Sequence, residues 1–456
     1  MLQTHDFDWE ELPRSIFDPD QLYVALSKYA PKNQPQPPDF NVELKAGLSL
    51  AYACFAKPQN VMKLKMLDFT LDTISQVTSN PSGSAGLTKF GSRKRDSQSE
   101  AYERGLKILG GGCPEPCIAF SRTQANNKTR LVWGFPYSMT AIEGLIAYPL
   151  NQNLQERRTP MAYSTTNLHL GASLRVASYR KRYCYALDMS SFDSSVSRVF
   201  IKFAFRIIQT WFDGDQIEIT SGRTCSEILD IIEHYFSTSS IVMPDGNIYH
   251  GRKHGVPSGS FFTQIVDSII NVIIAGMLSA RFHLGIERRH VHVLGDDLVF
   301  WSDRLVSLER VSMYAKSACN MTINVSKSSV ATYDQPIKFL GRVWSNGIPD
   351  LPITEILPKM VYPERYRRYS TDYQLRQRQA RLTLASYATV YNSAWWVVKG
   401  VLGTDKWDEA PGSLDSYIYD SSSGVLNFNP DHLAGLLRYK YLYHLDQVAS
   451  SVPHTA

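Results

Sequence analysis

Cysteine is scarce in this sequence, with six residues in a chain of 456. They are Cys54, Cys113, Cys117, Cys184, Cys225 and Cys319. So few cysteines in so long a chain argue against a disulfide framework and indicate a reducing compartment. Cys113 and Cys117 are close in sequence, but no second Cys or His pair at zinc-binding spacing accompanies them. Two free thiols are therefore favoured over a zinc site.

Long hydrophobic runs are also missing. The longest, around Ile269–Leu278, is interrupted by Asn271, and it is shorter than the ~20 residues that a membrane-spanning helix needs. The first residues, Met1–Pro13, are acidic and polar, unlike those of a signal peptide. We therefore expect a soluble, intracellular protein with no membrane segment.

A strong charge of one sign is absent as well. Lysine and arginine together number 48 against 43 aspartates and glutamates, which gives a net charge of +5. This balance is compatible with a polyanionic partner but does not require one. Hydrophobic residues make up 43% and charged residues 20%, which is ordinary for a globular protein. A chain of this length should form about two or three lobes.

Hydrophobic periodicity predicts strands and helices in the middle of the chain. A β-prone run, Tyr183–Leu187, ends at Asp188, and apolar residues at helical spacing follow over Ser194–Phe212. A longer helix is expected over Ser260–Leu278. Two β-prone arms within His290–Trp301 flank a Gly-Asp-Asp turn, as in a tight hairpin. This succession is typical of an α+β domain.

Three carboxylates stand where these predicted strands end, on Asp188, Asp296 and Asp297. If the strands are neighbours in one sheet, the carboxylates meet at one edge. Transfer of a nucleotidyl group to a 3′-hydroxyl uses two divalent ions, and Mg²⁺ prefers carboxylate oxygens. A Gly-Asp-Asp tripeptide alone is more often an ordinary turn. Three acids at one tip, however, repel one another without a cation.

Three stretches resemble, in order, the palm motifs of the viral RNA-dependent RNA polymerase family. They are DMSSFD from Asp188 to Asp193, GVPSGSFFT from Gly255 to Thr263, and LGDD from Leu294 to Asp297. The resemblance implies that Asp188 and Asp296 bind two Mg²⁺ or Mn²⁺ ions, with Asp297 as a weaker ligand. It also implies that Asp193 helps to recognise the ribose, and that Ser258 and Gly259 form a flexible loop at the substrate.

The predicted helix after this loop carries a polar stripe. On a helical wheel the stripe consists of Ser260, Thr263, Gln264, Asp267, Ser268 and Asn271. Small neutral side chains suit the wall of a wet cleft better than an open surface, although a plain amphipathic surface helix is the alternative. In the family a threonine and an asparagine on this helix act with the second aspartate on the ribose 2′-hydroxyl. Thr263 matches, but Asp267 stands where many relatives have asparagine. Asn271 is our choice, with Asp267 as the alternative.

Basic residues upstream of the first aspartate motif suit a triphosphate. Lys128 and Arg130 alternate along an extended segment and therefore face the same side. Such a pair often lies on a solvated strand, but its position resembles the family motif that meets the incoming nucleotide, which Arg122 would join. A guanidinium can also stack on a base.

Further resemblances lie around and beyond the hairpin. Lys327, in NVSKSS, matches the fourth palm motif, where a lysine can protonate the departing pyrophosphate; a surface lysine in a turn is the alternative. Ile337–Arg342 resembles the hairpin that supports the primer end, and Ser82–Arg95 is a candidate template-guiding loop. Lys359–Arg381 interleaves arginines with tyrosines, which favours contact with a nucleic-acid backbone over a solvated helix face.

The resemblance implies an α+β right-hand fold with fingers, a palm of antiparallel sheet backed by helices, and a mainly helical thumb. The expected divisions are fingers with fingertips at 1–180, palm at 181–212 and 255–345, a fingers insertion at 213–254, and thumb and C-terminal segment at 346–456. The string GVPSGSFFTQIVDSIIN resembles the partitivirus and picobirnavirus branch of double-stranded RNA viruses.

The implied reaction is template-directed attack of an RNA 3′-hydroxyl on an NTP, which replicates and transcribes a viral RNA genome. The implied partners are the RNA template, the product duplex, NTPs and a viral capsid protein, in the host cytoplasm and inside the virus particle. A reverse transcriptase is one alternative, although it typically has an aromatic pair before the double Asp, where this chain has Leu294-Gly295. A non-enzymatic viral RNA-binding protein is the other.

Overall fold

The structure is a computed structural model that describes residues 18–30, 41–124, 128–156, 159–163, 165, 167–350, 419–420 and 425–426. The described residues comprise most of the predicted fingers and palm. The basic segment Lys359–Arg381 and nearly all of the predicted thumb lie outside the described residues.

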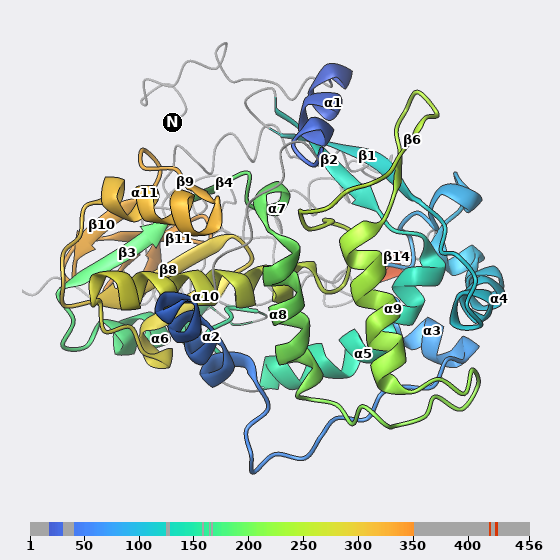
Figure 1. Ribbon diagram of the computed structural model, residues 1–456, viewed down its shortest axis with the longest axis horizontal. Helices are drawn as coiled ribbons and strands as arrows, with labels where there is room; N and C mark the ends of the chain where they lie inside the picture. Colours follow the sequence, from blue (N-terminus) through green and yellow to red (C-terminus); the bar gives the residue numbers. More distant parts are fainter. Residues whose placement is uncertain are drawn as a thin grey trace, which may run out of the picture.

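A long helix, α10 (Thr263–Phe282), runs through the middle of the fold (Figure 1). Residues 265–278 are all buried, including the polar Asp267, Ser268 and Asn271. By length and composition α10 would pass for a membrane span, but 78% of its most apolar window is buried within the protein. Helix α2 (Val42–Phe55) crosses it where Gly47 meets Gly276. A Cβ at Gly276 would lie 2.7 Å from the Gly47 Cα, so this close crossing requires glycine.

Above α10 lies an antiparallel sheet in the order β10-β3-β8-β7. Its strands are β3 (Tyr183–Leu187), β7 (Val291–Leu294), β8 (Asp297–Ser302) and β10 (Ser329–Thr332). Alternate side chains of β3 and β8 enter two cores, as the period of two in a strand requires. Tyr185 and Phe300 stack at 4.9 Å in the core that contains α10, whereas Cys184 and Trp301 join a smaller core on the opposite face.

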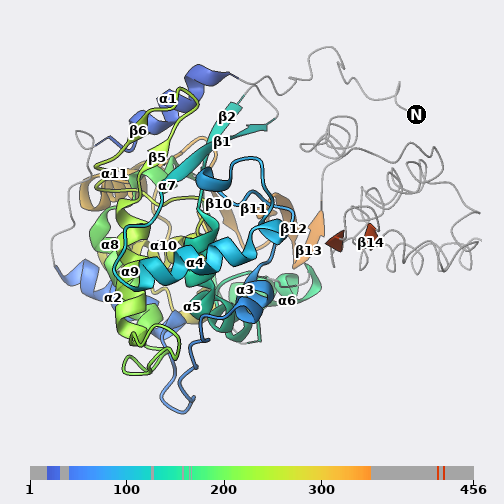
Figure 2. The same ribbon diagram turned by 90° about the vertical axis from the view of Figure 1, so that its right-hand side faces the viewer.

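A second sheet has the order β2-β1-β5-β6. Its strands are β1 (Cys117–Gln124), β2 (Lys128–Gly134), β5 (Ile241–Val242) and β6 (Ile248–Tyr249). The long β1–β2 hairpin extends beside helix α1 (Pro19–Ser27), as Figures 1 and 2 both show. Five helices contact one another in a connected group: α3 (Leu71–Val77), α4 (Gln98–Leu109), α5 (Tyr137–Glu156), α8 (Arg198–Gln209) and α9 (Cys225–Thr238).

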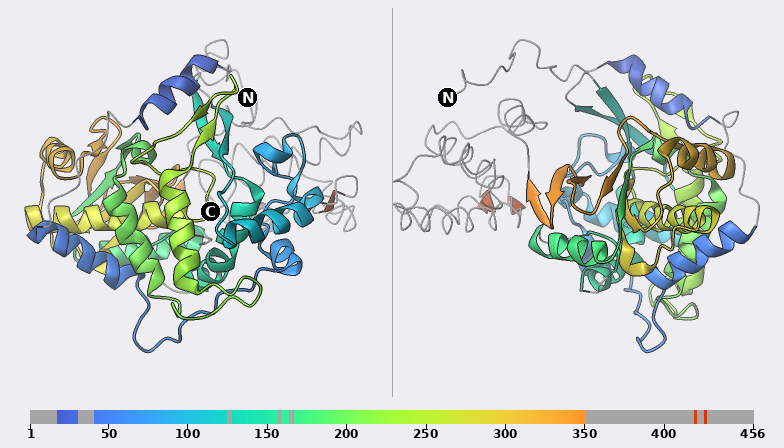
Figure 3. Two further views of the ribbon diagram at one scale, coloured as in Figure 1. Left: turned by 45° about the vertical axis from the view of Figure 1, so that its right-hand side comes forward. Right: turned by 90° about the vertical axis from the view of Figure 1, so that its left-hand side faces the viewer.

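The remaining elements are short or peripheral. They are α6 (Asn167–Ser178), α7 (Phe192–Ser195), α11 (Leu308–Cys319), β4 (Met189–Ser190), β9 (Thr322–Ile323), β11 (Ile337–Phe339), β12 (Arg342–Ser345), β13 (Ile348–Asp350), β14 (Tyr419–Asp420), β15 (Val425–Leu426), and the 3₁₀ turns η3 (Leu87–Lys89), η4 (Lys94–Asp96) and η5 (Arg288–His290). Strands β11, β12 and β13 form a small sheet, and β13 lies beside α6 (Figure 3).

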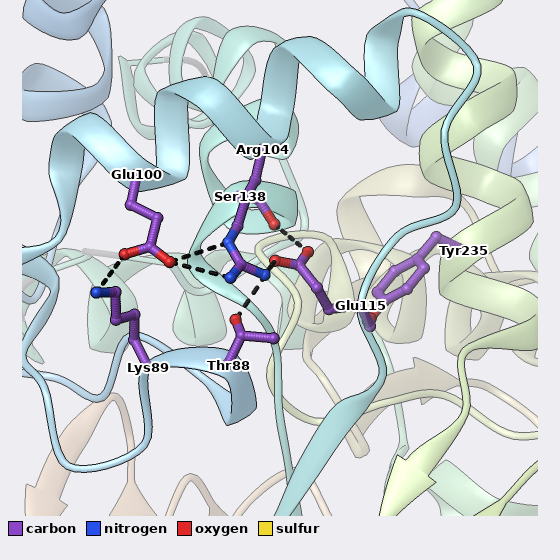
Figure 4. A network of polar contacts seen from close by, with 7 residues as sticks. All are labelled: Thr88, Lys89, Glu100, Arg104, Glu115, Ser138 and Tyr235. Carbon is purple, nitrogen blue, oxygen red and sulfur yellow. Dashed lines mark hydrogen bonds and ion pairs between the residues drawn. The ribbon is translucent and has the colours of Figure 1, made fainter.

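A polar network fastens the 79–96 loop, which carries η3 and η4, to the helices around it (Figure 4). On the loop, Lys89 Nζ lies 2.6 Å from Glu100 Oε2 of α4. Arg104, on the same helix, bridges Glu100 and Glu115 at 3.0 and 2.8 Å. Glu115 also accepts a hydrogen bond from Ser138 Oγ of α5 at 2.6 Å. The loop is thereby held against α4 and α5.

Most predicted elements have their expected type. The strand Tyr183–Leu187 and the hairpin around Gly-Asp-Asp are confirmed. The predicted helix Ser194–Phe212 is instead divided into α7 and α8, because Ser197 is extended and begins α8 as its N-cap. The predicted helix Ser260–Leu278 begins at Thr263 and continues to Phe282.

Candidate active site

Strand register places Asp188 beside the Gly-Asp-Asp turn. Leu187 of β3 pairs with Leu298 of β8, so the next residue, Asp188, lies opposite Asp297. Across the hairpin, Asp297 pairs with Leu294. The backbone of Asp188 is fixed on both sides, since its N–H donates to Ser328 Oγ at 3.0 Å and its carbonyl accepts from Asn324 N at 2.8 Å. The sheet edge expected from the sequence therefore exists.

The carboxylates at this edge influence one another. The pKa of Asp297 is raised to about 6, first by burial and then by the charges of Asp296 and Asp188. The pKa of Asp193 is also raised to about 6, by burial and then by Asp296, whereas Arg130 acts to lower it. Asp296 itself is exposed on the turn. The structure thus brings all four predicted aspartates into one electrostatic neighbourhood.

Helix α10 holds the turn from below. Gly295 N donates to Ser268 Oγ at 2.9 Å, and Asn271 Nδ2 donates to Gly295 O at 2.7 Å. Ser268 Oγ donates in turn to Gln264 O at 2.6 Å. The polar stripe of α10 is therefore partly a clamp for the hairpin, and not only the wall of an open cleft.

Asp267 differs from its neighbours on this stripe. Its side chain is 3% exposed and its Oδ1 has no hydrogen-bond partner among the described residues. Its pKa is raised well above the ordinary value by burial, and further by Asp193 and Asp296. Asn271, the choice made from the sequence, donates its amide nitrogen to Gly295 O, and its Oδ1 likewise has no partner among the described residues. Both alternatives thus present a buried oxygen without a protein partner.

The loop of residues 257–262 lies against the end of β2. Trp133 N donates to Ser258 Oγ at 3.1 Å. A Cβ at Gly259 would lie 1.8 Å from Trp133 O, so only glycine permits this approach. The Thr263 hydroxyl donates to Pro257 O at 2.6 Å and closes the loop onto the first turn of α10.

The predicted basic residues lie on the β1–β2 hairpin. Arg130 is paired directly across from Arg122, so the two side chains share one face of the sheet. The effect of Arg130 on the pKa of Asp193 indicates that this face is turned toward the carboxylates. Strand β2 begins at Lys128, whose side chain lies outside the described residues.

Two lysines share a cavity with the carboxylates. Its volume is about 530 Å³, and its lining includes Asp188, Asp297, Lys327 and Lys338. Lys338 acts to lower the pKa of Asp297. Lys338 lies in the segment that resembles the primer-supporting hairpin, but it was assigned no role from the sequence. The alternation of apolar and basic residues in β11 could have indicated it, because Ile337 and Phe339 are buried and Lys338 between them is exposed.

The carboxylates suit a hard divalent cation in their chemistry. Asp188, Asp296 and Asp297 offer only oxygen ligands, which Mg²⁺ and Mn²⁺ prefer. Repulsion among them raises the pKa of Asp297, and a bound cation would relieve it. Among the residues that the structure describes, no group of three His, Cys, Asp or Glu side chains lies close enough together to hold one metal ion.

Residues near the N-terminus brace the same region, which the sequence did not predict. Lys28 Nζ donates to Ser191 Oγ at 3.0 Å, and the Tyr29 hydroxyl donates to Val256 O at 3.3 Å. These contacts join positions more than 160 residues apart in the chain, so no local pattern could have indicated them.

A family model described as viral RNA-dependent RNA polymerase matches residues 120–392, which is more than half of the chain. The chain belongs to this family. The match includes both aspartate motifs, the 257–262 loop and β2, so family membership and the packed site rest on the same residues.

Curated relatives of the family carry the name RNA-directed RNA polymerase. The protein of Cryptosporidium parvum virus 1 is 31% identical over 211 residues, 43% of this chain and 37% of its own length. That of Atkinsonella hypoxylon virus is 30% identical over 169 residues, 35% of this chain and 25% of its own length. The matched regions thus span about a third or less of these relatives.

Solved structures agree in fold. The RNA-dependent RNA polymerase of a human picobirnavirus superposes with a TM-score of 0.70 at 16% identity, over 94% of this chain and 82% of that chain. Its insertion-loop deletion mutant gives a TM-score of 0.63 at 17% identity, over 92% and 82% of the two chains. The expected α+β polymerase fold and the resemblance to the partitivirus and picobirnavirus branch are both confirmed.

Proposed function

We propose that this chain is an RNA-directed RNA polymerase that replicates and transcribes a viral RNA genome. The observation that carries the proposal is the strand register that sets Asp188 opposite Asp297, at a sheet edge whose electrostatic neighbours include Asp193 and Arg130. Template-directed attack of an RNA 3′-hydroxyl on the α-phosphate of an NTP would take place there, with release of pyrophosphate.

Asp188 and Asp296 would hold two divalent ions, with Asp297 as a secondary ligand. When bound, such ions lower the pKa of the attacking hydroxyl and neutralise charge on the phosphates. Lys327 lines the cavity beside Asp188 and would give a proton to the departing pyrophosphate. Lys338, in the same cavity, would add positive charge next to Asp297.

Sugar and triphosphate recognition would come from the surrounding elements. Asp193 would contact the ribose together with Asp267 or Asn271, while Thr263 shapes the loop through its bond to Pro257. Lys128 and Arg130 would meet the triphosphate from β2. Buried polar groups that need a ribose hydroxyl discriminate strongly against a sugar that lacks it.

The proposal includes the predicted domain boundaries. These are fingers at 1–180 and 213–254, palm at 181–212 and 255–345, and thumb from 346. The template and product duplex would lie between fingers and thumb. A viral capsid protein and a location inside particles in the host cytoplasm are proposed as the setting.

Primer extension on a defined RNA template tests the proposal against its two alternatives. We expect NTPs to be incorporated and dNTPs to be used poorly; preferential use of dNTPs would indicate a reverse transcriptase. Replacement of Asp296 by Asn should abolish synthesis while RNA binding persists. RNA binding without synthesis by the unmodified chain would indicate a non-enzymatic protein, and unchanged synthesis by the variant would refute the assignment of Asp296.

A further inference from the structure

Helix α5 contains a glutamate whose side chain is completely buried beside the 257–262 loop. Glu143 is 0% exposed. Its Oε1 accepts a hydrogen bond from Ser260 Oγ at 2.5 Å, and its Oε2 accepts one from Phe261 N at 2.9 Å. A buried carboxylate costs free energy unless hydrogen bonds satisfy it. Both oxygens of Glu143 are satisfied by consecutive residues of one loop.

The opposite side of the loop is held by β2. Ser258 accepts from Trp133 N at 3.1 Å, and Gly259 lies directly against the Trp133 carbonyl. The loop is therefore held between two elements, with β2 contacting Ser258 and Gly259 and α5 contacting Ser260 and Phe261. If the α5 contacts were lost, residues 258–261 would keep only their contacts with β2, while Phe262 stays packed against Phe205.

Glu143 is also linked to the 79–96 loop through Lys94. The ammonium of Lys94 donates to Thr140 Oγ1 at 3.3 Å and lies 5.3 Å from the centre of the Tyr137 ring. Burial lowers the pKa of Lys94 to about 8, and the charge of Glu143 opposes that fall. The network in Figure 4 holds the same loop against α4 and α5. Polar contacts thus connect the 79–96 loop through α5 to the 257–262 loop.

We propose that Glu143 is a positioning residue that sets nucleotide affinity by holding the 257–262 loop docked between α5 and β2. The inference rests on the polymerase activity proposed above. If only the docked loop binds an NTP, the apparent dissociation constant rises in inverse proportion to the docked fraction. Loss of Glu143 should then raise KM, whereas kcat at saturating NTP should change little.

The electrostatics of Glu143 reflect both its burial and its two hydrogen bonds. Burial raises its pKa to about 7, while the bonds from Ser260 and Phe261 act to lower it. The other titratable groups that interact with Glu143 are Lys94, Cys117 and Tyr235.

Steady-state kinetics of two Glu143 variants test the proposal. Glu143→Ala should raise the KM for NTP about ten- to hundredfold, as expected for the loss of two hydrogen bonds to a charged group, with kcat within about twofold. Glu143→Gln keeps the shape and one acceptor, and should show a smaller rise.

Glu218 provides a matched control. It is also 0% exposed and accepts from backbone N–H groups, Phe69 N at 2.7 Å and Ser221 N at 2.6 Å, but it contacts no part of the 257–262 loop. Glu218→Ala should lower the melting temperature and leave KM within about twofold. An equal rise of KM in both alanine variants, or a wild-type KM in Glu143→Ala, would overturn the proposal.

Hydrogen exchange provides a readout that needs no activity. Amides of the 257–262 loop should exchange at least about tenfold faster in Glu143→Ala than in the wild type or in Glu218→Ala. Unchanged exchange would overturn the proposal, even if the wild type proved inactive and the polymerase assignment had failed. If Glu143→Ala does not fold, the KM values of Glu143→Gln and Ser260→Ala test the proposal instead. A wild-type KM in both of these variants would overturn the proposal.

Discussion

The clamp between α10 and the Gly-Asp-Asp turn leads to a specific prediction for Ser268. Its hydroxyl is 0% exposed, accepts from Gly295 N at 2.9 Å and donates to Gln264 O at 2.6 Å. Ser268→Ala removes the acceptor while keeping nearly the same volume. The Gly295 N–H then loses its partner directly beside Asp296.

The structure indicates the size of the effect. Gly295 is half-buried, so the loss is that of a typical hydrogen bond, ~0.5–1.5 kcal/mol. If catalysis requires the clamped position of the turn, this loss corresponds to roughly a 2- to 13-fold decrease in kcat. Asn271 still holds Gly295 O, so the decrease should fall in the lower half of this range.

Ser302 is the matched control for this substitution. It is also 0% exposed, donates to Leu284 O at 2.8 Å and accepts from Arg304 N at 3.0 Å, but it lies at the far end of β8. Ser302→Ala should lower the free energy of unfolding by about as much as Ser268→Ala does, but its kcat should equal that of the wild type. Single-turnover extension with saturating NTP, together with denaturant unfolding, measures both quantities. Equal kcat in the two variants would refute the role of the clamp.

Three further predictions concern the surrounding side chains. Lys327→Leu should slow single-turnover chemistry by about tenfold or more and alter its pH dependence, since Lys327 lines the cavity beside Asp188; wild-type rates would exclude it from proton transfer. Asp267→Ala should weaken the selection of NTP over dNTP more than Asn271→Ala does, because the Asn271 amide nitrogen is already bonded to Gly295 O. If neither variant weakens this selection, the polar stripe of α10 has a structural role only. The folded-state pKa of Asp297, about 6, exceeds the unfolded value. Its stabilising contribution is therefore lost as pH rises through about 6, and Asp297→Asn should raise the melting temperature of metal-free protein by about 2–4 °C at pH 7.5 and less at pH 5.

The sequence was informative where function depends on local pattern. The β-prone run before Asp188 and the apolar arms around Asp296 predicted strands that do pair in the expected sheet. Gly259 could be placed in a loop because its motif is recognisable, whereas its close approach to Trp133 could not be predicted. These features depend on residues adjacent in sequence, and therefore on periodicity and turn chemistry.

Other features depend on contacts between distant segments, which no periodicity reveals. Glu143 and Ser260 are 117 positions apart, so no local pattern connects them. A helical wheel places Asp267 and Asn271 on one stripe, and the preference for Asn271 follows the asparagine that the family has on this helix. Their different surroundings follow from tertiary packing, since Asn271 donates to Gly295 O and Asp267 lies near Asp193. The break between α7 and α8 likewise follows from packing, because the buried ring of His254 holds Ser194 O at 2.7 Å.

The most direct test of the proposed site is a crystal structure of the chain soaked with Mn²⁺ and an NTP, with the ions located by anomalous scattering. We predict Mn²⁺ bound to carboxylate oxygens of both Asp188 and Asp296, and its loss from the Asp296→Asn variant. Mn²⁺ bound elsewhere, with Asp188 and Asp296 free of metal in protein that still synthesises RNA, would contradict the assignment.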